Sequence, residues 1–169
     1  PLPGPAAVLA LGADVPVCLK APAAQRMRGI GEELAPVPVL PEVHMVLLNP
    51  GIPVPTREVF DRLRAGAGTD NPGLSPLPDA PDFDGFVRWL SAQRNDLGMP
   101  AIGIAPVIAE ALSRLRREKG CAIARMSGSG STVFGLFREA DTAAEAATRI
   151  AAGAPGWWVR AARVLAPGG

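Results

Sequence analysis

The sequence predicts an α+β fold with a mainly antiparallel sheet and packed helices. Short apolar runs bounded by glycine and proline are typical of strands, and segments with apolar residues at helical spacing lie between them. Neighbouring runs follow each other closely enough to pair as hairpins, which favours this fold over a doubly wound parallel sheet. The 169 residues, 48% of them hydrophobic, suffice for one core and not for two. We therefore expect one compact domain.

The first part of the chain predicts a brief helix followed by short strands. Residues 1–11 contain three prolines and an alanine-rich stretch, which suits at most a short helix. Extended segments are predicted at residues 15–19, 24–27, 34–39 and 43–48. The last of these is apolar almost throughout and ends at the Asn49–Gly51 turn. This pattern is typical of a central strand that is buried on both faces.

The remaining part predicts helices that alternate with a hairpin. Residues 56–63 resemble a helix start, with Thr56 as a possible N-cap and Val59, Phe60 and Leu63 at helical spacing. Residues 64–82 have no apolar periodicity and predict a surface loop. Further helices are predicted at residues 83–90, 102–119 and 141–152, and strands at residues 121–126, 131–137 and 158–165.

The charge balance excludes several classes of partner. Lys and Arg number 17 against 16 Asp and Glu, and the basic residues form no tract that would favour nucleic acid or a membrane surface. No apolar run approaches the length of a membrane span, and the start lacks the layout of a signal peptide. Cys18 and Cys121 lie far apart in apolar segments, which predicts buried, reduced thiols in a cytoplasmic protein and no metal site.

The segment Ser127, Gly128, Ser129 and Gly130 joins the two strands of the predicted hairpin. Glycines allow backbone N–H groups to approach a partner closely, so such a loop can bind an anion. Serine and glycine between two strands are also common as a plain connection. The apolar strand on each side favours a rigid loop at the end of the sheet.

Asp14 lies between Ala13 and Val15, where the predicted helix gives way to an extended segment. One interpretation is an Asx turn or a cap. The other is a carboxylate that accepts a proton or orients a hydroxyl, with Gly12 and Ala13 leaving room for a substrate beside the backbone.

Thr56 and Phe60 lie one helical turn apart and therefore share a face near the start of the predicted helix. A phenylalanine in this setting usually packs in the core. If it were exposed beside a hydroxyl, it would instead suit stacking on a planar base.

Four segments together resemble the GHMP kinases: LGADVP at residues 11–16, NPGIPVPTREVF at 49–60, NDL at 95–97 and MSGSGSTVFGLF at 126–137. The glycine-rich loop is shared by the wider family, whereas LGADVP with the PT-x-x-x-F helix start is more specific. The full set is similar to the branch of the family that acts on cytidine diphosphate methylerythritol in non-mevalonate isoprenoid biosynthesis.

The resemblance implies a ferredoxin-like C-terminal lobe at residues 24–169 and the end of an N-terminal lobe at residues 1–23. It implies a kinase that uses ATP and Mg²⁺, both bound mainly by the rest of the N-terminal lobe. The family's ATP loop, of the type GLGGGSSNAA, is not among these 169 residues. We therefore expect a fragment that has no turnover by itself.

The resemblance also implies a role for each candidate residue. Asp14 would orient or deprotonate the acceptor hydroxyl, and Gly12 and Ala13 would line the methylerythritol site. Thr56 and Phe60 would contact the cytidine. The Ser127–Gly130 loop would face the ATP loop across the cleft and complete the phosphate site.

One departure and two alternatives accompany the resemblance. The family usually has an acidic residue where this chain has Gly98, and Asn95 and Asp96 before it are expected to cap a helix. A different GHMP kinase, such as a homoserine or mevalonate kinase, is an alternative. A stand-alone ferredoxin-like domain that binds small molecules without catalysis is another.

Overall fold

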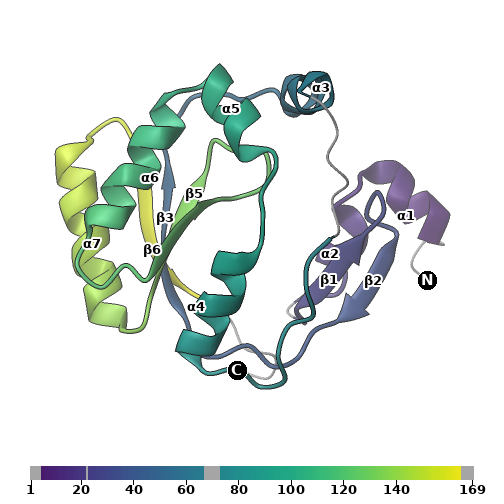
Figure 1. Ribbon diagram of the computed structural model, residues 1–169, viewed down its shortest axis with the longest axis horizontal. Helices are drawn as coiled ribbons and strands as arrows, with labels where there is room; N and C mark the ends of the chain where they lie inside the picture. Colours follow the sequence, from purple (N-terminus) through teal and green to yellow (C-terminus); the bar gives the residue numbers. More distant parts are fainter. Residues whose placement is uncertain (1–4, 22, 67–72, 165–169) are drawn as a thin grey trace.

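The computed structural model describes residues 5–21, 23–66 and 73–164, arranged as a larger and a smaller part (Figure 1). The larger part is a four-stranded sheet with helices packed on it, and the smaller part is the hairpin of β1 and β2 with α1 and α2 beside it. The strands are β1 Gln25–Arg28, β2 Glu33–Pro36, β3 His44–Asn49, β4 Ile123–Met126, β5 Val133–Phe137 and β6 Trp158–Arg163. The helices are α1 Pro5–Leu11, α2 Val15–Cys18, α3 Thr56–Ala65, α4 Phe83–Ala92, α5 Gly98–Ile104, α6 Val107–Arg117 and α7 Ala140–Gly153. The predicted α+β class is confirmed.

The larger sheet has the strand order β4-β5-β3-β6, and every neighbouring pair is antiparallel. β3 is therefore a central strand, as its apolar sequence predicts. Leu47 pairs with Phe134 of β5 on one side and with Arg160 of β6 on the other. β4 pairs with β5 alone, which makes β4 an edge of the sheet.

Helices cover the two faces of this sheet differently. Val46 and Leu48 of β3 point to one face and join the main core, to which α6 and α7 contribute Ile108, Leu115 and Ile150. Met45 belongs to the other face, where α4 covers a second and smaller cluster. The period of two along β3 thus sends alternate side chains into two separate cores.

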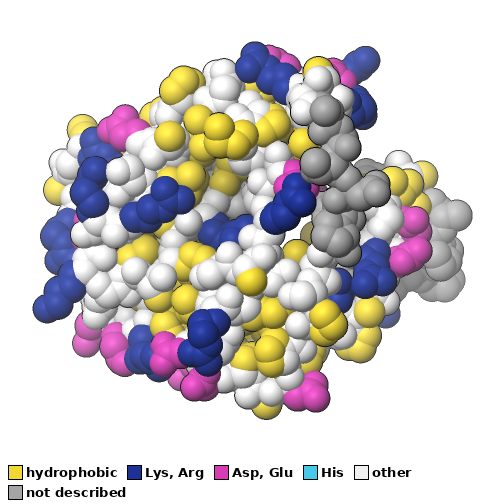
Figure 2. Space-filling model, viewed as in Figure 1, with side chains coloured by type: hydrophobic (Ala, Val, Ile, Leu, Met, Phe, Trp, Pro, Cys, Tyr) yellow, Lys and Arg dark blue, Asp and Glu magenta, His cyan; other side chains and the backbone are white. Residues whose placement is uncertain are grey.

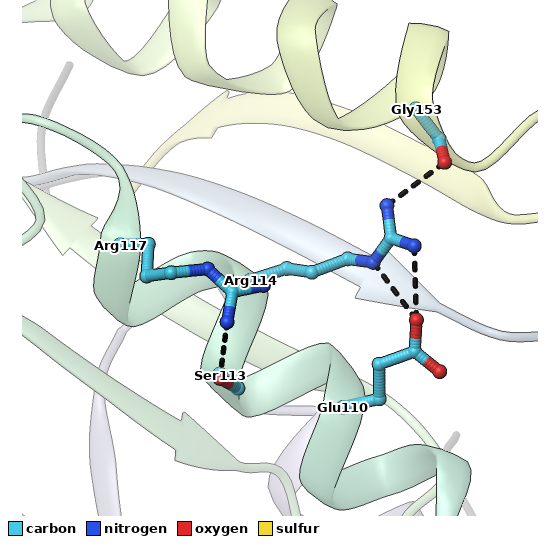
Figure 3. Close-up of polar contacts among 5 residues, drawn as sticks. All are labelled: Glu110, Ser113, Arg114, Arg117 and Gly153. Atoms are coloured by element: carbon cyan, nitrogen blue, oxygen red, sulfur yellow. Dashed lines mark hydrogen bonds and ion pairs between the residues drawn. The ribbon is translucent and has the colours of Figure 1, made fainter.

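Arg114 ties α6 to α7 above the main core (Figure 3). Its guanidinium donates to Oε1 of Glu110 on its own helix and, at 2.8 Å, to the carbonyl oxygen of Gly153 at the end of α7. The same group lies 4.9 Å from the ring centre of Trp157. A cation beside the last carbonyls of a helix offsets the partial negative charge there, so Arg114 fixes where α7 ends.

The single helix predicted at residues 102–119 is wrong in its first part. The structure has α5 and α6 instead, which meet at an angle of 118° across Ala105 and Pro106. Pro106 has no N–H and its ring clashes with the preceding turn, so a continuous helix through it is unfavourable. Among the described residues no single helix is long and apolar enough to cross a membrane, although α5 and α6 taken together would pass on length and composition.

The N-terminal prediction of an extended segment at residues 15–19 is also wrong, because Val15–Cys18 form the short helix α2. Pro16 lies in the first turn of α2, where a missing N–H costs nothing. β-branching in Val15 and Val17 indicated a strand, but local turn geometry prevails over that weak preference. Cys18 is exposed on α2, so the prediction of two buried thiols is wrong for this one.

Gly31, in the turn between β1 and β2, lies against the segment that precedes α2. A Cβ atom at this position would be 2.1 Å from the carbonyl oxygen of Ala13. The backbone of Gly31 also has a φ of +112°, which other residues rarely adopt. The hairpin therefore supports the backbone beside Asp14, and only glycine fits the contact.

Candidate functional site

The start of α3 and the Ser127–Gly130 loop meet at one end of the larger sheet. The hydroxyl oxygen of Thr56 lies 3.0 Å from that of Ser129. The prediction that Thr56 is the N-cap of α3 is wrong. Pro55 holds that position, and Thr56 is the first helical residue. Its hydroxyl is thereby available to the loop instead of its own helix.

Internal hydrogen bonds fix the shape of the Ser127–Gly130 loop. The N–H of Ser127 donates to Thr132, and the N–H of Gly130 donates back to Ser127. Within the described part of the chain, no hydrogen bond engages the N–H groups of Gly128 and Ser129. These two N–H groups, and not all four, are left for an anion.

Asn49, at the end of β3, holds the loop from one side. Its amide nitrogen donates to the hydroxyl of Thr132 at 2.9 Å, and its amide oxygen accepts from the N–H of Gly51 at 2.8 Å. The hydroxyl of Ser131 donates to the carbonyl of Ile52 at 2.7 Å and approaches the Asn49 oxygen at 3.4 Å. One side chain thus links the turn after β3 to the end of the loop.

Asn95 holds the loop from the other side. Its amide nitrogen donates to the carbonyl oxygens of Met126, at 3.2 Å, and Gly128, at 3.0 Å. Its oxygen accepts from the N–H of Leu97 at 3.2 Å. Asp96 pairs with Arg94 at 2.8 Å, so its predicted capping role is wrong. Asn95 is not the N-cap of α5 either, because Leu97 holds that position, but its bond to the N–H of Leu97 caps the turn that leads into the helix.

Sequence reasoning did not find the roles of the two asparagines. Asn49 was expected to belong only to a turn, and Asn95 only to a cap. A short amide side chain after a buried strand, or between two helices, was the available signal. The groups to which their amide nitrogens donate lie 31 to 83 positions away in the sequence, so these contacts depend on the sheet pairing.

Val59 and Phe60 are adjacent on α3 and have opposite surroundings. Val59 is fully buried in the main core, whereas Phe60 is 41% exposed. The structure therefore does not place Phe60 in the core. Its ring is accessible on α3, the same helix whose first residue, Thr56, contacts the loop. This exposure is what stacking on a planar ligand would need.

Asp14 and its neighbours lie apart from this loop, in the smaller part with the hairpin (Figure 1). Asp14 is exposed at the start of α2, and its side chain makes no capping hydrogen bond. Ala13 is exposed as well, and Gly12 is half-buried. The structure brings together Thr56 and the Ser127–Gly130 loop, and it presents Asp14 to solvent in a separate turn.

The residues that the structure describes offer no site for a metal ion. They contain no group of three or more His, Cys, Asp or Glu side chains close enough to bind one. Any Mg²⁺ that accompanies a nucleotide would need ligands from the nucleotide and from other protein residues. The loop supplies N–H donors instead, which suit phosphate oxygens.

Comparison with known proteins gives the same family as the four sequence segments. Residues 79–155 match the family model described as "GHMP kinases C terminal". The chain is 52% identical, over 167 residues, to a 4-diphosphocytidyl-2-C-methyl-D-erythritol kinase of Cereibacter sphaeroides, which covers 98% of this chain and 59% of that protein. It is 54% identical, over 159 residues, to the protein of the same name from Paracoccus denitrificans, with 94% and 56% covered.

Solved structures agree with the sequence comparison. A crystal structure of 4-(cytidine 5'-diphospho)-2C-methyl-D-erythritol kinase matches with a TM-score of 0.66 and 31% identity, covering 99% of this chain and 58% of the other. Homoserine kinase from Cytophaga hutchinsonii matches with a TM-score of 0.54 and 13% identity, over 84% of this chain and 48% of the other, which shows a shared fold alone.

The chain spans about three-fifths of the length of the relatives from Cereibacter sphaeroides. The residues that match the family model include β4, β5, the Ser127–Gly130 loop and helices α4 to α7, whereas β3 and β6 lie outside them. Residues 79–155 thus resemble the C-terminal domain of the GHMP kinases, and the fold of the chain matches that of a solved kinase of this kind.

Proposed function

We propose that this chain forms part of a kinase that transfers the γ-phosphate of ATP to the 2-hydroxyl of 4-diphosphocytidyl-2-C-methyl-D-erythritol. The names of relatives at about 50% identity support this substrate. Because the chain spans about three-fifths of those relatives, the activity belongs to a longer protein. The rest of that protein would bind ATP and Mg²⁺ for the most part.

The contact between Thr56 and Ser129 is the observation that carries the proposal. It joins the helix expected to bind cytidine to the loop expected to complete the phosphate site. A substrate whose base lies on Phe60 would extend its diphosphate past Thr56 toward the N–H groups of Gly128 and Ser129. A nucleoside diphosphate ester has this order of groups.

Phosphoryl transfer needs mainly positioning and stabilisation of charge. The carboxylate of Asp14 would orient the acceptor hydroxyl or accept its proton, and Gly12 and Ala13 would contact the methylerythritol part. Asp14 is exposed and free of a capping bond, which leaves its oxygens available for this role. The same proposal places the end of the N-terminal lobe at residue 23 and the start of the C-terminal domain at residue 24.

A cytoplasmic location completes the proposal. Cys18 and Cys121 are both free thiols, which fits a reducing compartment. The expected partners are the small-molecule substrate and the N-terminal lobe, and not nucleic acid or a membrane.

The test uses the full-length protein that contains this chain. Asp14→Asn should lower kcat by a factor on the order of a hundred or more while binding of the cytidine substrate persists. Asp79→Asn is the matched control, because Asp79 is an exposed acid in the segment before α4. Equal turnover in both variants would remove Asp14 from the reaction.

A second measurement tests the base site separately. Phe60→Ala should weaken substrate binding by about 1–3 kcal/mol, the range for stacking on one base. Met99→Ala is the control, because Met99 is 78% exposed on α5 and lies outside the proposed site. Unchanged affinity in the folded Phe60 variant would argue against cytidine at this position.

A further inference from the structure

A groove of about 610 Å³ runs along β4, the open edge of the larger sheet. One wall comes from α6, through Leu112 and Arg116, and the other from Ser91 and Asn95 at the end of α4 and beyond it. Figure 2 shows a hollow in the middle of this face, with basic side chains beside it and within it. Its floor is β4 itself, so the groove follows an extended backbone.

The backbone of β4 has hydrogen-bonding groups that face the groove. The N–H of Ser127 donates to the carbonyl of Thr132, so these two residues form a hydrogen-bonded pair. Arg125 and Phe134 lie opposite each other two positions further along and form a pair of the same kind. In an antiparallel pair, alternate residues bond to the partner strand and those between them point away. The N–H and C=O groups of Ala124 therefore point to the open edge.

In the described part of the chain, no group from outside the sheet forms a hydrogen bond with these two groups of Ala124. Ala124 lines the groove and belongs to the main core, and the whole residue is 6% exposed. Asn95 already occupies the carbonyl of the next outward residue, Met126. An unpaired edge of this kind accepts an added strand unless charge or proline blocks it.

The groove carries positive charge and no acidic side chain lines it. Arg116 is exposed and has no ion pair within residues 5–21, 23–66 and 73–164. Arg125 donates to the carbonyl of Leu90 at 2.9 Å, which holds its guanidinium beside the strand edge. Burial lowers the pKa of Arg125, so a nearby anion would be favourable there.

We propose that this groove binds an extended peptide segment with acidic side chains, which adds to the sheet as a strand alongside β4. The backbone of Ala124 supplies the pairing, and Arg116 and Arg125 select negative charge. A second copy of the chain fits less well, because pairing two β4 edges would bring four arginines together. The proposal does not depend on the proposed kinase activity.

The probe is a fluorescein-labelled peptide of about six residues that alternates Glu and Val, a length typical of one strand. Fluorescence anisotropy with this chain should show saturable binding that weakens with salt. The same peptide with methyl groups on alternate backbone nitrogens should bind about tenfold more weakly or worse, as expected for the loss of one or more hydrogen bonds. Hydrogen exchange at the Ala124 amide should slow when the unmodified peptide is bound.

Two arginines on α6 provide matched variants. Arg116→Glu should abolish detectable binding, because it reverses one of the two charges in the groove. Arg117→Glu makes the same charge change on the neighbouring residue, whose guanidinium bonds to Ser113 of its own helix at 2.8 Å and does not line the groove (Figure 3). This control should bind nearly as the unmodified chain does. Ala124→Pro would remove the outward N–H and should also abolish binding if the variant stays folded.

Several results would overturn the proposal. Equal binding of the methylated peptide would show attraction by charge without strand pairing. Displacement of the peptide by millimolar inorganic phosphate at constant ionic strength would indicate an anion site. Self-association of the chain through β4, with no peptide binding, would assign the edge to a second copy. Equal affinity of the Arg116 and Arg117 variants would remove the groove from the interaction.

Discussion

The hydroxyl of Thr56 and the hydroxyl of Ser129 lie 3.0 Å apart, although 73 positions separate them in the chain. Thr56 begins α3, and Ser129 lies in the loop between β4 and β5. Val59, one turn further along α3, is buried in the main core that also contains β5, so the helix is fixed relative to the sheet. The contact links two predicted parts of the site.

A double-mutant cycle measures that contact. Thr56→Val and Ser129→Ala should each lower the free energy of unfolding of the chain by no more than about 1.5 kcal/mol, because the hydrogen bond is exposed. The double variant should lose less than the sum of the two, which gives the coupling. Urea unfolding provides the measurement. Strict additivity would show that the two hydroxyls do not interact in solution.

Asn95→Asp separates the two functions of that side chain. Aspartate keeps an oxygen that accepts from Leu97 but loses the N–H₂ group that donates to Met126 and Gly128. We expect a loss of about 1–3 kcal/mol in the free energy of unfolding, because two carbonyl oxygens lose their donor and face a carboxylate. Amide exchange in the loop should accelerate. If Asn95→Ala causes an equal loss of stability, the effect comes from the missing N–H₂ donor. Unchanged stability and amide exchange in Asn95→Asp would contradict a role of Asn95 in holding the loop.

Val59 and Phe60 test how burial divides neighbouring residues. Val59→Ala removes buried methyl groups and should cost about 2 kcal/mol of folding stability. Phe60→Ala removes a larger side chain that is 41% exposed, and it should cost less than Val59→Ala. Thermal or urea unfolding of the two variants decides. A larger loss for Phe60 would return its ring to the core.

Gly31→Ala tests the support of the hairpin for the Asp14 turn. The added Cβ would collide with the carbonyl oxygen of Ala13, and the positive φ would add strain. We expect destabilisation of more than about 1 kcal/mol and faster amide exchange around residues 13–18. Gly73→Ala is a control with positive φ and open space around it. Equal effects would show that strain alone, without the contact, accounts for the loss.

The two thiols should differ in reactivity. Cys18 is exposed, so it should react first with a disulfide reagent near neutral pH. Burial raises the pKa of Cys121 from 9.0 to about 11, so its thiolate is scarce until strongly alkaline pH. Comparing Cys18→Ser with Cys121→Ser assigns the fast and the slow reaction. A fast reaction in Cys18→Ser would contradict the assignment.

The same pKa shift predicts a dependence of stability on pH. Between pH 9 and about 11 the unfolded chain loses the Cys121 proton while the folded chain keeps it. The unfolded state then binds fewer protons, so the free energy of unfolding falls as pH rises through this range. The fall should be smaller in Cys121→Ser than in the unmodified chain. Identical pH profiles would show that the thiol does not titrate differently on folding.

The sequence by itself determined the fold class and the central strand. Alternation of apolar runs with helical periodicity is local information, and four short segments in the right order point to the GHMP kinases. It also identified Asp14, Thr56, Phe60 and the Ser127–Gly130 loop as candidates, whose roles stay predictions. The wrong predictions also came from local patterns. The β-branched residues of α2 indicated a strand, and the continuous apolar periodicity of residues 102–119 indicated one helix although the chain bends at Pro106.

The tertiary structure decided which side chains meet. Antiparallel pairing of β3 with β5 brings Asn49 to Thr132, and the path after α4 brings Asn95 to Gly128. The same packing buries Val59 and leaves Phe60 exposed, although the sequence pattern counted both as apolar positions of one helix. These contacts depend on residues far apart in sequence, and no local pattern encodes a distance between two separate segments. The Ser127–Gly130 loop could be found from sequence, whereas the two asparagines that hold it could not.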